Sequence, residues 1–186
     1  EQSFRESGLL SIVLPDSITS LGDGVFMECE QLESVTLSNS ITTLGDNTFR
    51  ESGLRSIVLP DSITSLGESV FMQCAQLESV ILSNSLTTIG DEAFRGSGLR
   101  SIVLPDSITS LGAYAFWQCD QLESTTLSNS ITSIGYGAFK YCQRLSSILI
   151  SDSTLVHDDA FIGCDILEAK ASSVSFSISR EKMSIK

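Results

Sequence analysis

The chain repeats itself with a period of 45 residues, and this repeat limits its fold more than any other feature. Residues 4–48 align without gaps to residues 49–93 with 35 of 45 positions identical, and residues 94–138 continue the series. Each block divides again into two similar units of 22 and 23 residues. A unit this short cannot bury its own apolar face, but stacked copies can, so the sequence predicts a solenoid.

The first half of each unit has the pattern Leu-x-x-Ile-x-Leu, which predicts a short β-strand. In the first unit, Ile12 and Leu14 alternate toward the interior. Ser11 and Val13 point to the opposite face. The units begin at eight leucines: Leu9, Leu32, Leu54, Leu77, Leu99, Leu122, Leu145 and Leu167.

The second half of each unit predicts a turn followed by a short helical or 3-10 segment. Gly22 allows a backbone conformation that a Cβ atom would resist. Val25, Phe26 and Cys29 then form one apolar side of the segment. Each coil is therefore predicted to carry a strand on one face and a helical turn on the opposite face.

This pattern, as it stands from Leu99 to Cys119, resembles the BspA-like (treponemal-type) leucine-rich repeat, and the match extends from Phe4 to about Leu167. The resemblance implies an α/β fold, a right-handed leucine-rich-repeat solenoid with one parallel β-strand per coil and short helical or 3-10 turns on the opposite face. It also implies a surface or secreted protein that binds other proteins, mediates adhesion and has no catalytic residues.

The repeats predict a single domain over residues 1–179 and a C-terminal tail over residues 180–186. The first residues correspond to the end of a unit, so we expect further repeats upstream of them. Val174, Phe176 and Ile178 alternate with serines, a pattern that predicts a strand closing the last coil.

The composition excludes several classes of function. The net charge is −12, with 11 Lys and Arg against 23 Asp and Glu, whereas nucleic acids and anionic membrane surfaces attract basic proteins. The sequence has no run of about 18 apolar residues, so we expect no membrane insertion within this chain. It has a single His and no metal-ligand spacing. We therefore expect no enzyme activity, no metal and no cofactor.

Stacking places equivalent residues of successive strands in columns about 4.8 Å apart. Two columns point outward from the predicted sheet, one of them all serine and the other β-branched. Strand propensity alone explains such residues, whereas a flat, uncharged face of this kind also suits protein binding. The candidate binding face comprises Ser11, Val13, Ser34, Thr36, Ser56, Val58, Ser79, Ile81, Ser101, Val103, Ser124 and Thr126.

Acidic and basic residues alternate in the position just before these serines. This charge column comprises Glu33, Arg55, Glu78, Arg100 and Glu123. Exposed ion pairs contribute only about 0–1 kcal/mol each to stability. We therefore interpret the alternation as a ladder that fixes the register between neighbouring coils.

Large apolar residues alternate with Arg or Lys in the position after each phenylalanine. They form a candidate lateral stripe of Met27, Met72, Trp117 and Ile162. Two interpretations are open. Each residue packs beneath the stem of a neighbouring base, or the stripe docks a second copy or a partner.

The five cysteines share one position of the unit, where other units have serine. Exchange with serine and an odd number of cysteines favour buried free thiols. The alternative is one disulfide among Cys119, Cys142 and Cys164, which fall on consecutive coils.

His157 lies in a shortened unit, with Ser153 and two aspartates nearby. No nucleophile elbow or oxyanion-hole pattern accompanies it. We interpret this segment as a repeat that departs from regular stacking, and not as a hydrolase site.

The sequence therefore predicts a non-catalytic protein-binding module, located at a cell surface or secreted, that acts in adhesion or recognition through the repeated solenoid face. Its expected partners are proteins, including extracellular host or matrix proteins. The alternative is a structural repeat protein that self-associates, laterally or end to end, into a filament or extracellular coat.

Overall fold

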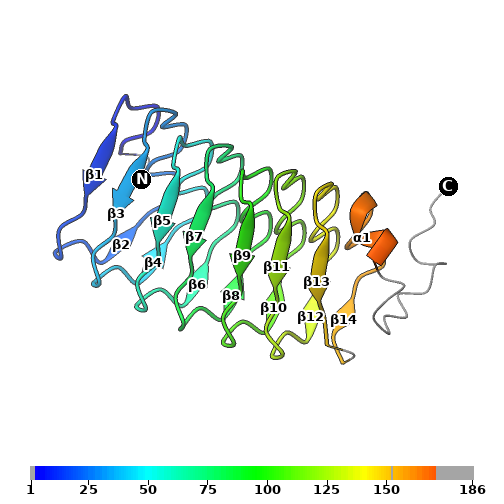
Figure 1. Ribbon diagram of the computed structural model, residues 1–186. Coiled ribbons are helices and arrows are strands. Elements are labelled where there is room, and N and C mark those ends of the chain that lie inside the picture. Colours follow the sequence, from blue (N-terminus) through cyan, green and yellow to red (C-terminus); the bar gives the residue numbers. More distant parts are fainter. Residues whose placement is uncertain (1–2, 152, 171–186) are drawn as a thin grey trace.

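The computed structural model describes residues 3–151 and 153–170, which form an elongated stack of coils (Figure 1). Each coil contributes one three-residue strand to the front of the stack and one two-residue strand to a second face. The front strands are β1 (Ser11–Val13), β3 (Ser34–Thr36), β5 (Ser56–Val58), β7 (Ser79–Ile81), β9 (Ser101–Val103), β11 (Ser124–Thr126) and β13 (Ser147–Leu149). The second-face strands are β2 (Ser20–Leu21), β4 (Thr43–Leu44), β6 (Ser65–Leu66), β8 (Thr88–Ile89), β10 (Ser110–Leu111), β12 (Ser133–Ile134) and β14 (Leu155–Val156).

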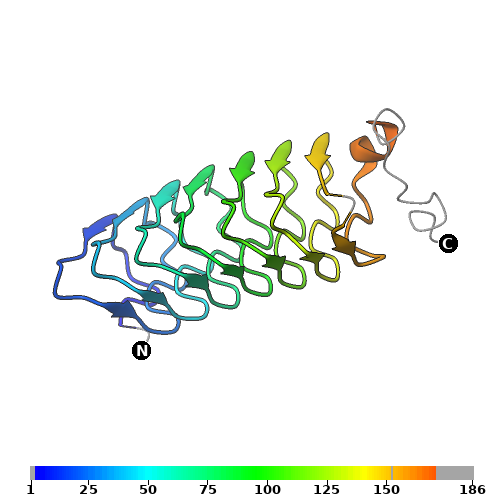
Figure 2. The ribbon, with the colours of Figure 1, turned by 90° about the horizontal axis from the view of Figure 1, so that it is seen from below.

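Strands pair in parallel with their equivalents in neighbouring coils. The second-face strands form one seven-stranded sheet in the order β14-β12-β10-β8-β6-β4-β2. The front strands form two sheets, β1-β3-β5-β7 and β13-β11-β9, which follow one another along the stack (Figure 2). The predicted parallel solenoid is confirmed. The second sheet was not predicted, and its strands lie where only a turn was expected.

The helical or 3-10 turns expected on the opposite face are not formed in the described coils, and this part of the prediction is wrong. The segment around Phe26 consists of tight turns in which Gly24 and Glu28 have φ values of 60° and 59°. Two left-handed residues four positions apart cannot belong to one right-handed helix. The backbone pairs between coils instead, because the N–H of Phe26 donates to the carbonyl of Thr48 at 2.8 Å.

The α/β class is therefore replaced by a strand-dominated solenoid. The only helix in the described residues is α1 (Asp165–Lys170), after the last coil. Leu167, expected to begin an eighth unit, lies in this helix. The predicted closing strand, with Val174, Phe176 and Ile178, and the predicted tail lie outside the described residues.

A column of stacked phenylalanine rings runs along the core. Successive ring centroids are 5.1–5.5 Å apart, and neighbouring ring planes lie within 12° of each other. The rings belong to Phe4, Phe26, Phe49, Phe71, Phe94, Phe116, Phe139 and Phe161. The inward leucines, isoleucines and valines join the same hydrophobic cluster. Each coil thus buries its apolar side chains against its neighbours.

Close approach between coils explains the glycine that follows each second-face strand. A Cβ atom on Gly90 would lie 2.6 Å from the carbonyl oxygen of Gly67, and one on Gly135 would lie 2.8 Å from that of Leu111. Gly22, at the start of this column, has no atom within 4 Å of the same position. Glycine is therefore required in this column by the close approach of neighbouring coils. The positive φ that we expected at Gly22 is not found there.

All five cysteines are buried free thiols, as the exchange with serine predicts. Cys74 donates a hydrogen bond from Sγ to the carbonyl of Phe49 at 2.9 Å, and its Sγ lies 3.4 Å from the hydroxyl of Ser52. Cys29 and Cys119 have equivalent contacts with the preceding coil. Burial raises the pKa of the Cys74 thiol to about 11, so this thiol stays neutral and connects its coil to the preceding one.

Candidate functional site

The candidate binding face is formed by the outward side chains of the front strands. All twelve of its predicted residues are exposed. Its larger apolar members include Val13, Ile81 and Val103, which are 74%, 63% and 67% exposed. The buried residue between each outward pair, such as Val80, points into the core. We call this surface the front face.

Strand register aligns the outward side chains into columns within each of the two front sheets. Ser11 pairs with Ser34, and Ser56 pairs with Ser79. In the neighbouring column, Val58 is beside Ile81. The result is a serine column next to an apolar column that comprises Val13, Thr36, Val58, Ile81, Val103, Thr126 and Leu149. This arrangement offers apolar contact and hydroxyl hydrogen bonds at every coil.

The charge column borders the front face, but it does not form the expected ladder of ion pairs. Arg55 and Glu33 form one pair, at 3.6 Å, and both side chains are about 60% exposed. No ion pair involves Glu78, Arg100 or Glu123 within residues 3–151 and 153–170. Most of these alternating charges are therefore open to a partner.

The front strands are not equally well paired along the stack. Strand β7 and strand β9 are close but belong to different sheets, whereas the second sheet continues unbroken past this point. The two strands are 22 residues apart in sequence, while most neighbours, such as β1 and β3, are 23 apart. The shorter spacing alone does not explain the interruption, because β3 and β5 are also 22 residues apart and remain paired. We call the interruption between β7 and β9 the front seam.

The four residues of the candidate lateral stripe are all half-buried. The guanidinium carbon of Arg95 lies 4.0 Å from the centre of the Trp117 ring, within cation–π range. Trp117 also contacts the ring of Tyr114, with centroids 4.9 Å apart. Packing against a neighbouring base therefore covers part of the stripe, and the front face presents more exposed apolar surface.

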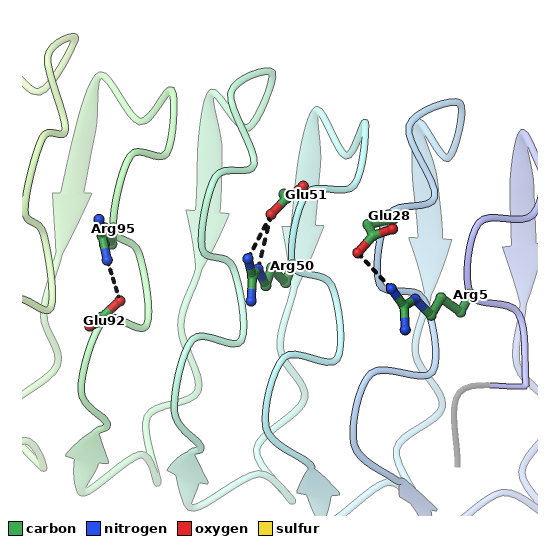
Figure 3. A network of polar contacts seen from close by, with 6 residues as sticks. All are labelled: Arg5, Glu28, Arg50, Glu51, Glu92 and Arg95. Carbon is green, nitrogen blue, oxygen red and sulfur yellow. Dashed lines mark hydrogen bonds and ion pairs between the residues drawn. The ribbon is translucent and has the colours of Figure 1, made fainter.

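The three arginines that alternate with the stripe are held by carboxylates on the same side of the stack (Figure 3). Arg5 donates to Glu28 at 3.0 Å, across one coil. Arg95 donates to Glu92 at 2.8 Å within its own coil. Arg50 pairs with the adjacent Glu51. These pairs satisfy charges locally, whereas Glu78, Arg100 and Glu123 beside the front face form no ion pair with another described residue.

Three aspartates, each directly after the glycine that follows a second-face strand, connect neighbouring coils. Asp46 accepts a hydrogen bond at Oδ1 from the backbone N–H of Glu68, at 2.8 Å. Asp23 and Asp91 accept equivalent bonds from the next coil, at 3.0 and 2.8 Å. These three carboxylates therefore have a structural role, because each satisfies a backbone donor of the next coil.

Two further observations concern His157 and the side chains that could bind a metal ion. The Nδ1 atom of His157 accepts a hydrogen bond from the backbone N–H of Asp159 at 3.3 Å, and its ring packs edge-on against Tyr136. No cluster of three or more His, Cys, Asp or Glu side chains suits a metal ion in the described part of the chain. In the same residues, no helix is long and apolar enough to cross a membrane.

Comparison with known families identifies the repeat. The model of the BspA type leucine rich repeat region, in six copies, matches residues 1–120 and 66–182. The chain belongs to the BspA-type leucine-rich repeat family. Families of leucine-rich repeats are generally protein-interaction modules and are typically non-catalytic. No curated protein matches the sequence.

Two solved structures of leucine-rich repeat proteins are similar to this BspA-type chain. It is similar to the leucine-rich repeat protein TpLRR of T. pallidum, with 26% identity and a TM-score of 0.81 over 90% of this chain and 84% of that one. It is also similar to a leucine-rich repeat protein from Bacteroides ovatus, with 29% identity and a TM-score of 0.75. That match covers 89% of this chain and 49% of the Bacteroides protein, so the BspA-type region described here spans about half of that relative.

Proposed function

We propose that this BspA-type protein is a non-catalytic binding module that recognises partner proteins through its front face. The observation that carries the proposal is the exposed apolar column, in which Val58, Ile81 and Val103 are 59–67% exposed along one continuous surface. Contiguous apolar surface of this kind marks interaction sites on soluble proteins. The protein-interaction role of leucine-rich repeat families supports the same conclusion.

The front face suits a partner that makes many small contacts. Each coil presents one serine hydroxyl and one apolar or threonine side chain, and the next coil repeats them about 4.8 Å away. The strands hold these side chains on a hydrogen-bonded scaffold, so little conformational entropy is lost when they are covered. Affinity then grows with the number of coils that a partner spans.

The second part of the proposal is location. We propose that the front face is presented outside the cell, where it binds extracellular host or matrix proteins and acts in adhesion. The resemblance to the BspA-like class supports this location. Labelling of intact cells of the source organism with an antibody to residues 1–186 tests it, and labelling only after permeabilisation would contradict it.

The alternative function is assembly of a filament or coat through the lateral stripe. Half-burial of the stripe and the cover of Trp117 by Arg95 leave it less apolar surface than the front face. We therefore base the proposed function on the front face.

A binding panel tests the front face. Purified fibronectin, laminin and collagen are immobilised, and binding of the wild-type chain is compared with that of Val58→Asp/Val103→Asp. The matched control is Ser65→Asp/Thr88→Asp, which adds the same charge at exposed positions of β6 and β8 on the second face. We expect the front-face variant to bind at least about tenfold more weakly and the control to bind like wild type. Equal loss in both variants, or no binding to any of the three proteins, would contradict the proposal.

A further inference from the structure

The stability of the chain does not explain why the signs alternate along the charge column. Glu78, Arg100 and Glu123 lie exposed beside the front face and form no ion pair with another described residue. Their signs nevertheless alternate strictly from coil to coil. Charges placed in this order and left unpaired within the chain are suited to recognition across an interface, where complementary charges set orientation and register.

A partner that matches this column needs alternating charges at the spacing of parallel strands, next to an apolar column at the same spacing. The front face of a second copy has both properties. If the second copy is turned by 180° about an axis parallel to the strands, its charge column faces the first charge column. Its apolar column then faces the first apolar column as well.

We propose that two copies of this chain pair front face to front face, about a two-fold axis that passes between β7 and β9, at the front seam. Glu78 then faces Arg100 of the second copy, and Ile81 faces Val103 of the second copy. The proposal rests on the proposed function, because it uses the same face and names one partner for it.

The register follows from the signs of the charges. An axis through β7 itself would place Glu78 against its own equivalent and Arg55 against Arg100, so like charges would meet throughout. An axis along the length of the stack would place every residue of the charge column against its own equivalent if it passed over that column. Displaced from the column, it would place the charges against other positions of the strands. An axis between β7 and β9 brings only opposite charges together, and it also places Arg55 against Glu123.

This axis also favours the apolar column. It pairs Val58 with Thr126 and Thr36 with Leu149 of the second copy, so no apolar residue faces a charge. An axis between β5 and β7 matches signs equally well but places the exposed Leu10 against Glu123. The axis at the front seam is therefore preferred.

The expected pairing is weak and reversible. Six front strands of each copy overlap, which spans about 24 Å at a strand spacing of about 4.8 Å. With front strands of three residues, about 10 Å long, the overlap covers roughly 240 Å² per copy. This area is small compared with the roughly 800 Å² per partner of a standard stable interface. Because the charges are exposed, added salt should also weaken the pairing.

Trans-complementation between two charge variants tests the proposal. Glu78→Arg alone places Arg against Arg100 of the second copy, and Arg100→Glu alone places Glu against Glu78. In an equimolar mixture, one copy supplies only Arg at these two positions and the other supplies only Glu, so every contact at the axis becomes opposite in sign. Sedimentation equilibrium of the 186-residue chain, from micromolar to about millimolar concentration, measures the dimer constant.

We expect the wild type to dimerise, each single variant to dimerise at least about tenfold more weakly, and the mixture to recover to within about threefold of wild type. Glu68→Arg, with the same charge change at an exposed turn away from the front face, should dimerise like wild type. A wild-type chain that is monomeric at all concentrations would overturn the pairing. A mixture as weak as the single variants would overturn this axis. Neither result affects binding to matrix proteins, which decides the proposed function separately.

Discussion

The rings of Phe49 and Phe71 lie parallel, with centroids 5.5 Å apart and planes 4° apart, and neither ring is exposed to solvent. Phe94 continues the stack on the other side of Phe71 at 5.3 Å. This column connects each coil to the next through the centre of the core. The stability of the solenoid should therefore depend on rings in the middle of the stack more than on the ring at its end.

Replacing a central ring should have a large effect. We expect Phe71→Ala to lower the free energy of unfolding by about 3–5 kcal/mol, because it removes a fully buried side chain and two stacking contacts. Phe4→Ala is the matched control, since Phe4 is 39% exposed and stacks on one ring only. Urea unfolding measures both. Equal losses would show that the stack does not act as a continuous core.

Alanine in place of the glycines that follow the second-face strands should change stability to different extents at positions that look alike in sequence. We expect Gly90→Ala to destabilise the protein by more than about 2 kcal/mol, because its Cβ would lie 2.6 Å from the carbonyl of Gly67. Gly22→Ala meets no atom within 4 Å and should be neutral or slightly stabilising. Thermal unfolding of the two variants checks this. A loss in Gly22→Ala as large as in Gly90→Ala would point to a backbone requirement instead of close approach.

The buried thiol of Cys74 predicts a loss of stability at alkaline pH. Burial raises its pKa in the folded protein from 9.0 to about 11. The folded state therefore holds this proton more tightly than the unfolded state does, so the contribution is complete below pH 9 and is lost as pH rises toward 11. Cys74→Ser, which copies the serine of other coils, removes the titration. Between pH 8 and pH 11 its unfolding free energy should fall by about 2 kcal/mol less than that of wild type. Parallel curves for the two proteins would contradict this.

The phenol of Tyr136 should titrate late. Its hydrogen bond with Asp159, together with contact with Tyr114, raises its pKa to about 12. Replacing Asp159 with Asn removes the negative charge, so the pKa of Tyr136 should move back toward its ordinary value of 10.0. Absorbance of tyrosinate against pH measures the change, and Tyr136→Phe identifies the phase that belongs to this residue. A late phase that survives in Asp159→Asn would exclude the carboxylate as the main cause.

The sequence was sufficient to predict the front of the solenoid, because the alternation of outward and inward residues repeats in every unit. Ser11–Val13 and its equivalents alternate between outward and inward residues, and stacking of repeats makes a parallel pairing the only way to bury the inward set. The outward positions of the candidate binding face follow from the same alternation. Exchange of cysteine with serine was likewise enough to predict buried thiols.

The other features of the fold depend on contacts between coils, and the sequence of a single unit does not indicate these contacts. The two-residue strands such as Ser20–Leu21 are too short for a periodic signal, and they exist because Leu21 pairs with Leu44 in the next coil. The apolar Val-Phe pattern resembles one side of a helix, yet Glu28 is left-handed. Nothing in a glutamate predicts that conformation, which is imposed by hydrogen bonds to the next coil.

The charge column shows a similar limit. Alternating signs in sequence suggested a ladder of ion pairs, but among the described residues of this column only Arg55 and Glu33 form one, at 3.6 Å. Long exposed side chains gain little from pairing in water, so alternation alone does not create contacts. We therefore explain the alternation of charge by contacts with a second molecule.

Photo-cross-linking from the front face tests the central claim most directly. A photoreactive benzoyl-phenylalanine replaces Val103 on β9 in one variant and Thr88 on β8, on the second face, in the other; both positions are exposed. Each variant is irradiated with whichever matrix protein of the panel binds the wild-type chain, and the cross-linked product is quantified. We predict abundant product from position 103 and little from position 88. Equal yields, or a higher yield from position 88, would contradict recognition through the front face.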